Sequence, residues 1–233
     1  VISGIESAGG GNITLTSSTG KVTQDGTGLL KSTGTLTVSA QNGIFLSTAS
    51  NAVDTGITLT NSGTGSLEYK GSMSGVLDVS ATNTSGDITI DATGPYLKAS
   101  NVSNTSGNIN FKGSNDVKLA GTVVSSGGNV TITATGGQII NYASHSVSGT
   151  QINLTAGTSV GDSGAAITVN ASGLVNAQAE NVYLSSAGNL PIGSITGNTA
   201  TGIVDLRSTA GAITDANGST NNITASDLKL SAY

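Results

Sequence analysis

"SSGGNVTITATGGQII", residues 125–140, places five residues of alternating character between two glycine pairs. Val130 and Ile132 would share one face of a short strand, because successive side chains of a strand point to opposite sides. The pairs Gly127–Gly128 and Gly136–Gly137 give the backbone the freedom to turn at both ends of that strand. The stretch therefore predicts one short strand between two corners, and its glycines shape a scaffold.

Units of the same form recur along the chain and align into ladders of apolar positions. They include GNITL at 11–15, GTLTV at 34–38, GDITI at 86–90, GNINF at 107–111, TQINL at 150–154 and ENVYL at 180–184. The first ladder comprises Ile13, Leu36, Ile57, Leu77, Leu97, Val117, Ile139, Val160, Val182, Val204 and Leu228. The second comprises Val22, Ile44, Leu67, Ile88, Ile109, Val130, Ile152, Leu174 and Ile195, and a less regular third set comprises Val102, Val123, Val147, Ile167 and Leu190.

The steps within the two main ladders are roughly 20 to 24 residues, which is the range of solenoid repeats. A period near 21 residues with two or three short strands favours an all-β fold, a right-handed parallel β-helix (β-solenoid) of about eleven coils. At roughly 4.8 Å a coil this makes a rod on the order of 50 Å long. We expect residues 1–233 to form a single continuous β-helix. A sandwich of antiparallel hairpins is the main alternative fold.

Composition limits the functional classes. Charged residues are 9% of the 233 residues and aromatic residues 3%, and there is no cysteine, which excludes disulfides and thiolate metal sites. Because the net charge is -5 and the pI near 4.5, nucleic-acid binding has little support. No run of 18 apolar residues and no signal peptide is evident, so we expect no direct membrane insertion and a fragment of a longer repetitive protein.

Three stretches, GNVTITATGGQI at 128–139, GNITLTSSTGKV at 11–22 and AGAITDANGSTNNITASDLKLSA at 210–232, carry a resemblance to a known family. They resemble the haemagglutinin-type repeats of filamentous adhesins of Gram-negative bacteria, including those exported by two-partner secretion. The resemblance implies a right-handed β-helical shaft that is secreted or displayed at the bacterial cell surface and acts in attachment, aggregation or biofilm formation. It also implies an outer-membrane secretion partner for the full-length protein.

No catalytic, cofactor-binding or metal-binding residues emerge from the sequence, and we expect the chain not to be an enzyme. Neither a phosphate-binding glycine loop nor a glycine- and aspartate-rich calcium repeat is present. Asp87 and Asp91 share the outer side of one strand without a clear third acid, and Asp215 is typical of a turn. His145 has no acidic or second histidine partner nearby in sequence, and Arg207 is expected to point outward.

Outward residues suggest one place for binding. Those of the first ladder are expected to be Thr14, Thr37, Thr58, Asp78, Lys98, Lys118, Ile140, Gly161, Tyr183, Asp205 and Lys229. The threonine array would then end after three coils, which disfavours an ice-binding surface. Ile140, Tyr142 and Tyr183 would flank the gap at Gly161 and form a possible ligand-contact patch, because exposed aromatic rings can stack on sugars.

Possible N-glycosylation sites of the form N-x-S/T occur at Asn12, Asn83, Asn101, Asn104, Asn129, Asn153, Asn170, Asn217 and Asn222. Taken together, the sequence predicts a structural shaft segment of a bacterial adhesin. Its partners would be a host-cell or matrix receptor, or a polysaccharide. Two alternatives remain open, a carbohydrate-active β-helix enzyme (lyase or hydrolase) and an ice-binding solenoid.

Overall fold

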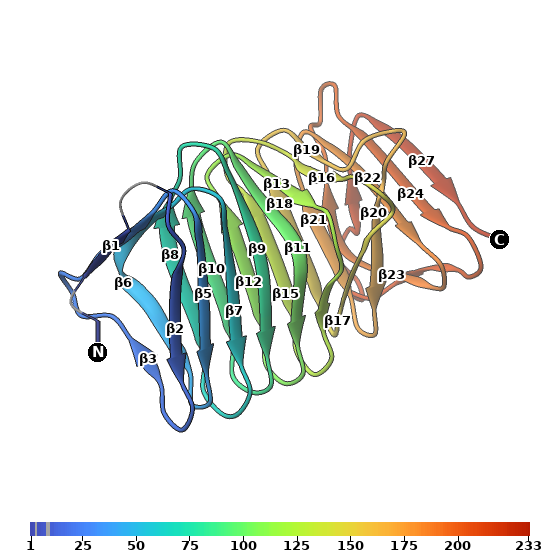
Figure 1. Ribbon diagram of the computed structural model, residues 1–233. Coiled ribbons are helices and arrows are strands. Elements are labelled where there is room, and N and C mark those ends of the chain that lie inside the picture. The colour runs from blue at the N-terminus through green and yellow to red at the C-terminus, as the bar shows by residue number, and fades with distance from the viewer. Residues whose placement is uncertain (3, 8–9) are drawn as a thin grey trace.

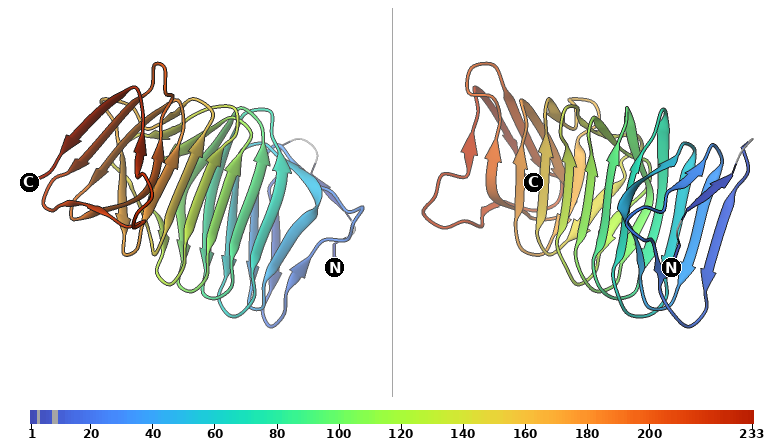
Figure 2. Two further views of the ribbon diagram at one scale, coloured as in Figure 1. Left: turned by 180° about the vertical axis from the view of Figure 1, so that it is seen from behind. Right: turned by 90° about the vertical axis from the view of Figure 1, so that its left-hand side faces the viewer.

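The computed structural model describes residues 1–2, 4–7 and 10–233, and these form strands and turns without a helix. The chain winds from the amino-terminal to the carboxy-terminal end as a stack of parallel coils, a β-solenoid of about 10 turns spaced by about 22 residues (Figure 1). The predicted parallel β-solenoid is confirmed. Successive coils lie directly beside one another in the views of Figure 1 and Figure 2, and the strands of each coil pair with those of its neighbours.

Two parallel sheets enclose the interior. Sheet 1 contains β1 (Ile5–Ser7), β3 (Val22–Thr23), β4 (Leu30–Ser32), β6 (Ile44–Val53), β8 (Leu67–Ser72), β10 (Ile88–Thr93), β12 (Ile109–Gly113), β15 (Val130–Ala134), β18 (Ile152–Ala156), β21 (Val175–Gln178), β23 (Leu190–Thr196), β25 (Ile213–Asp215) and β26 (Ile223–Thr224). Sheet 2 contains β2 (Ile13–Ser17), β5 (Thr35–Ala40), β7 (Gly56–Asn61), β9 (Val76–Asn83), β11 (Tyr96–Asn104), β13 (Asp116–Leu119), β14 (Val123–Ser125), β16 (Ile139–Asn141), β17 (Ser146–Gly149), β19 (Ser159–Val160), β20 (Ile167–Ala171), β22 (Asn181–Ser186), β24 (Ile203–Ser208) and β27 (Asp227–Ser231).

The strand in the opening stretch has the predicted alternation. Val130 and Ile132 of β15 are fully buried, whereas Thr131 between them is partly exposed. Residues 126–129 and 135–138 on either side are turns, which confirms the two glycine corners. The same inward positions in neighbouring coils stack to form one continuous aliphatic core along the axis.

The first ladder is confirmed except for one step. Ile13 pairs with Leu36 and Leu36 with Ile57, and the pairing continues without interruption from Leu77 to Leu228. Ile57, however, pairs with Val79 rather than Leu77. Leu77 and Val79 both face inward because they are two residues apart in β9, so side-chain character alone does not distinguish them.

The second ladder is confirmed from Val22 to Ile152 and then shifts. Ile152 pairs with Val175 instead of Leu174, which is only half-buried. Ile195 pairs with Ala177, beyond an irregularity in the register of β21 and β23. The prediction at Leu174 was wrong by one residue because the coil from Ile152 to Val175 is one residue longer than the coil from Val130 to Ile152.

The third set is confirmed only at its start, where Val102 pairs with Val123 and Val123 with Val147. Val147 then pairs with Val169 rather than Ile167. Leu190 lies in sheet 1, where it pairs with Ile213, and does not belong to this set. The third side is therefore a local feature of sheet 2.

A column of glycines lies at the corner between a sheet 2 strand and the following sheet 1 strand in successive coils from β7 to β15. Gly65, Gly86 and Gly107 have φ angles of 96°, 89° and 122°, in the region that favours glycine. A Cβ at Gly107 would stand 2.2 Å from the Gly86 oxygen, and one at Gly128 would stand 2.2 Å from the Gly107 oxygen. Ser125 completes this corner by donating to the Gly107 oxygen at 2.7 Å and accepting from the Gly128 N–H at 2.9 Å.

The residue after each corner glycine accepts a hydrogen bond from the next coil. The Asn108 N–H donates to the Asp87 carboxylate at 2.8 Å, and the Asn129 N–H donates to the Asn108 side chain at 3.0 Å. The Gln151 N–H donates to the Asn129 side chain at 3.1 Å. This outer column gives a physical reason for the recurring Gly-Asn and Gly-Asp pairs in the sequence.

A second, inner column of asparagines occupies the same corner from inside. Asn61, Asn83 and Asn104 are buried, and Asn61 Nδ2 donates to Asn83 Oδ1 at 2.8 Å. Asn83 Nδ2 and Asn104 Nδ2 both donate to the Gly86 oxygen at 2.9 Å, and Asn104 Nδ2 also donates to the Asn108 oxygen at 3.0 Å. These amides satisfy turn carbonyls that would otherwise be buried without a partner.

The largest buried side chain is that of Tyr69 in sheet 1. Gly71 leaves the space for this ring, since a Cβ there would stand 2.5 Å from the Tyr69 hydroxyl. That hydroxyl is buried without a hydrogen-bond partner. Burial, with a smaller contribution from Asp54, raises the pKa of Tyr69 far above its usual value.

We predict that Ile109→Asp lowers the free energy of unfolding by at least about 3 kcal/mol, because an unpaired carboxylate would enter the stacked core. Asn110→Asp on the same strand is the matched control, since Asn110 is exposed. Chemical denaturation measures both. Equal stability of the two variants would contradict the assignment of Ile109 to the core.

Candidate ligand-binding hollow

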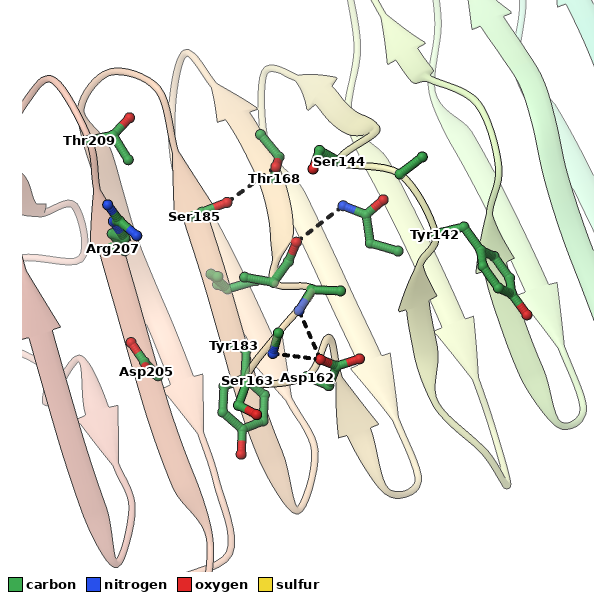
Figure 3. Close-up of a pocket in the computed structure, with 16 residues that line it drawn as sticks. Tyr142, Ser144, Asp162, Ser163, Thr168, Tyr183, Ser185, Asp205, Arg207 and Thr209 are labelled. Carbon is green, nitrogen blue, oxygen red and sulfur yellow. Dashed lines mark hydrogen bonds between the residues drawn. The ribbon is translucent and has the colours of Figure 1, made fainter.

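An open hollow of about 510 Å³ lies on the outer face of sheet 2, towards the carboxy-terminal half of the chain. It forms where two successive coils are interrupted, by residues 142–145 between β16 and β17 and by residues 161–166 between β19 and β20. In the next coil β22 is continuous again, and it pairs with both β19 and β20. The two links and the outer faces of β22 and β24 thus surround the hollow, which we call the tyrosine hollow (Figure 3).

The buried side chain of Asn141 holds the first link. Its Oδ1 accepts from the His145 N–H at 2.9 Å. Its Nδ2 donates to the His145 oxygen at 3.0 Å and to the Ala166 oxygen of the second link at 3.1 Å. Ser144 has a φ of 56°, which a residue with a side chain adopts at a cost. One amide therefore ties both links together.

The second link is a turn built on Asp162. The Asp162 carboxylate accepts from the Gly164 N–H at 2.7 Å and from the Ala165 N–H at 2.8 Å. Gly161 enters the turn with a φ of 72°, and a Cβ there would stand 2.7 Å from the Tyr183 oxygen. The close approach of these backbones requires glycine at this position.

Two of the three residues predicted as a contact patch line the tyrosine hollow. Tyr142 has an exposed fraction of 61%, and Tyr183 is partly exposed on β22. Ile140 does not line the hollow. It lies in β16, where it pairs with Lys118 of β13, and it precedes the link at residues 142–145. The structure thus brings together Tyr142 and Tyr183 across the interruption at Gly161, as the sequence suggested, and leaves Ile140 aside.

Two charged residues of β24, Asp205 and Arg207, also line the hollow (Figure 3). Asp205 pairs with Tyr183 in the register, and Arg207 pairs with Ser185. Within residues 10–233, no ion pair or side-chain hydrogen bond occupies either of these groups. Sequence reasoning placed Arg207 on the surface without a role. The available signal was its spacing of two residues from Asp205, which puts both on one face of the strand.

A cation held by aromatic rings lies next to the hollow. The Lys118 ammonium stands 3.4 Å from the centroid of the Tyr96 ring and 5.6 Å from that of Tyr142. Both distances fit cation–π contacts. Tyr142 is therefore supported on the amino-terminal side by Lys118, an arrangement that the sequence analysis missed.

The other acids considered from the sequence have structural partners. Asp87 belongs to the outer column, and the Asp91 carboxylate stands 3.4 Å from the Lys112 ammonium. Asp215 accepts from the Asn217 N–H at 2.8 Å, which confirms the turn, and a hydrogen bond from the Asn222 side chain lowers the pKa of Asp215. His145 contributes backbone groups to the Asn141 network.

A second surface feature corrects the predicted row of outward threonines. Thr58 pairs with Ser80 rather than Asp78, so the row does not end in a charge after three coils. A parallel row runs beside it, two residues further along each strand. We call the two rows the hydroxyl array, which comprises Thr14, Thr37, Thr58 and Ser80 with Thr16, Ser39, Thr60 and Thr82.

The possible glycosylation sites differ in accessibility. Asn83 and Asn104 are buried and their amides hold the inner column, so a sugar there is incompatible with the folded corner. Asn101 and Asn170 are exposed. The remaining candidates are exposed or half-buried and use side-chain atoms in hydrogen bonds, namely Asn12, Asn129, Asn153, Asn217 and Asn222.

Comparison with protein-family models, with curated proteins and with solved structures gives no match to this chain. In the described part of the chain, no group of three or more histidine, cysteine or acidic residues is arranged to hold a metal ion. The described residues likewise contain no helix with the length and apolar character needed to cross a bilayer.

We predict that Gly161→Ala lowers the free energy of unfolding by at least about 2 kcal/mol, because it adds left-handed backbone strain to a steric conflict with the Tyr183 oxygen. Gly164→Ala in the same link is the control. A Cβ there meets nothing closer than 3.4 Å, and we expect a change within about 0.5 kcal/mol. Thermal unfolding of both proteins is the measurement, and equal melting temperatures would refute the role given to Gly161.

Proposed function

We propose that the chain is a shaft segment of a bacterial adhesin, secreted or displayed at the cell surface, which acts in attachment, aggregation or biofilm formation. The observation that carries the proposal is the continuous pairing of successive strands in sheet 2 from β2 to β27. Backbone hydrogen bonds in such a stack run along the rod, so the coils resist extension together. The resemblance to haemagglutinin-type repeats supports the same function.

In this proposal the chain acts by spacing. About ten turns at roughly 4.8 Å each separate its two ends by on the order of 50 Å. A rod of that length holds a recognition surface away from the cell without chemical turnover. The partners that we propose are a host-cell or matrix receptor or a polysaccharide, and an outer-membrane secretion partner for the full-length protein.

The proposal predicts that attachment depends on the length of the shaft. Removing the coding region for this chain from its gene should reduce the attachment of cells under flow at least several-fold. Inserting a tandem duplicate of the region at the same position should restore attachment. Electron microscopy should show a rod longer by on the order of 50 Å in the duplicate. Unchanged attachment after the deletion would overturn the proposal.

The hydroxyl array favours a second function, ice binding by the solenoid. Its hydroxyls repeat at roughly 4.8 Å along the axis and at roughly 6.8 Å along the strands on one sheet face. Thr14, Thr58 and Thr82 are exposed, and the array covers four successive coils. A flat and regular set of hydroxyls can hold water in ordered positions.

For this second function, we predict that the purified chain produces thermal hysteresis and that Thr60→Lys removes most of it, because a long cation interrupts the flat array. The matched control is Thr133→Lys on sheet 1, away from the array. A wild-type chain without thermal hysteresis would rule out ice binding, and equal loss in both variants would remove the array from the explanation.

A further inference from the structure

We propose that the tyrosine hollow binds an extended neutral glycan, with sugar rings against Tyr142 and Tyr183 and sugar hydroxyls at Asp205 and Arg207. The inference deepens the proposed function and rests on it for its biological meaning, because it makes the shaft itself a contact surface. The volume of about 510 Å³ lies within the range of small-ligand sites.

The spacing of the two tyrosines along the axis suits an extended glycan. Tyr142 follows β16 and Tyr183 lies in β22, with β19 between them in the pairing order of sheet 2. The two tyrosines are therefore two coils apart, at an axial separation of about 10 Å. An extended glycan with one sugar ring on each tyrosine would bridge this distance along the axis. The Lys118 ammonium contacts Tyr142 on one side, which favours one orientation of this exposed ring.

Polar groups with free hydrogen-bonding capacity line the hollow beside the tyrosines. Arg207 offers donors and Asp205 offers acceptors, and neither side chain is engaged by another group in the described chain. Thr168 and Ser185 add hydroxyls 3.2 Å apart on the wall of the hollow. Sugars present both donors and acceptors, so such a mixed set matches their hydroxyl groups.

Charge decides between a neutral and an acidic glycan. The hollow contains the carboxylates of Asp162 and Asp205 but only one cation, Arg207. The whole chain carries a net charge of -5 as well. An acidic glycan would meet the Asp205 carboxylate beside Tyr183 and the negative charge of the whole chain, which together disfavour it, although the Lys118 ammonium lies beside Tyr142. A neutral glycan avoids this repulsion and still uses Arg207 as a donor.

The test measures binding of the purified full chain to neutral hexamers of glucose, mannose and galactose units, with polygalacturonate as the acidic comparison. We expect at least one neutral hexamer to bind, and Tyr142→Ala with Tyr183→Ala to weaken it at least tenfold. The matched control is Tyr233→Ala, because Tyr233 is also exposed but lies at the carboxy-terminal end. Restoring both rings as phenylalanine should recover most of the affinity, and melting temperatures report whether each variant folds.

Three results would overturn the inference. They are no binding to any neutral hexamer, equal binding by the double alanine variant, and preferential binding to polygalacturonate. Failure here is distinct from failure of the shaft proposal, because a duplicated shaft with both alanine substitutions would still restore attachment by length alone.

Discussion

The corner between the two sheets is the constraint on which the rest of the fold depends. Each coil must reverse direction in a few residues, and the carbonyl groups of that turn are shielded from water by the coils on either side. The glycine column gives the backbones room to approach, and the asparagine columns supply the missing hydrogen bonds. The aliphatic core contributes most of the burial, but it stacks in register only because these corners align.

The sequence was informative about the core for a simple physical reason. Inward positions of a narrow solenoid require β-branched and other aliphatic side chains, and these recur at the coil period, so both main ladders could be read in outline. The register in which neighbouring strands pair was harder to predict from the sequence. Leu77 and Val79 face the same interior, and only the backbone pairing shows that Val79 continues the row of Ile57. The error of one residue at Leu174 has a related cause, since turn lengths are not encoded in hydrophobicity.

The candidate site was half predictable. Tyr142 and Tyr183 could be found because each lies in or next to an outward row of sheet 2. Asp205 and Arg207 were not recognised as part of the site, because they share a hollow with the tyrosines only through the links at residues 142–145 and 161–166. Those links interrupt two coils and leave the next one whole, which creates the hollow. A binding place can thus arise in a solenoid through a local change of turn length, without disturbing the core beneath it.

The two asparagine columns also carry a consequence for slow chemical change in the protein. Asparagine side chains lose ammonia slowly and become carboxylates. In the outer column Asn108 accepts from the Asn129 N–H, but its Nδ2 also donates to the Asp87 carboxylate at 3.3 Å, so a carboxylate at position 108 would face that of Asp87. In the inner column Asn83 and Asn104 donate to a carbonyl oxygen, and a carboxylate would place negative charge against it. Loss of ammonia would therefore place negative charge against an acceptor in either column, so the corner that stacks the coils is also the place where slow hydrolysis would loosen them.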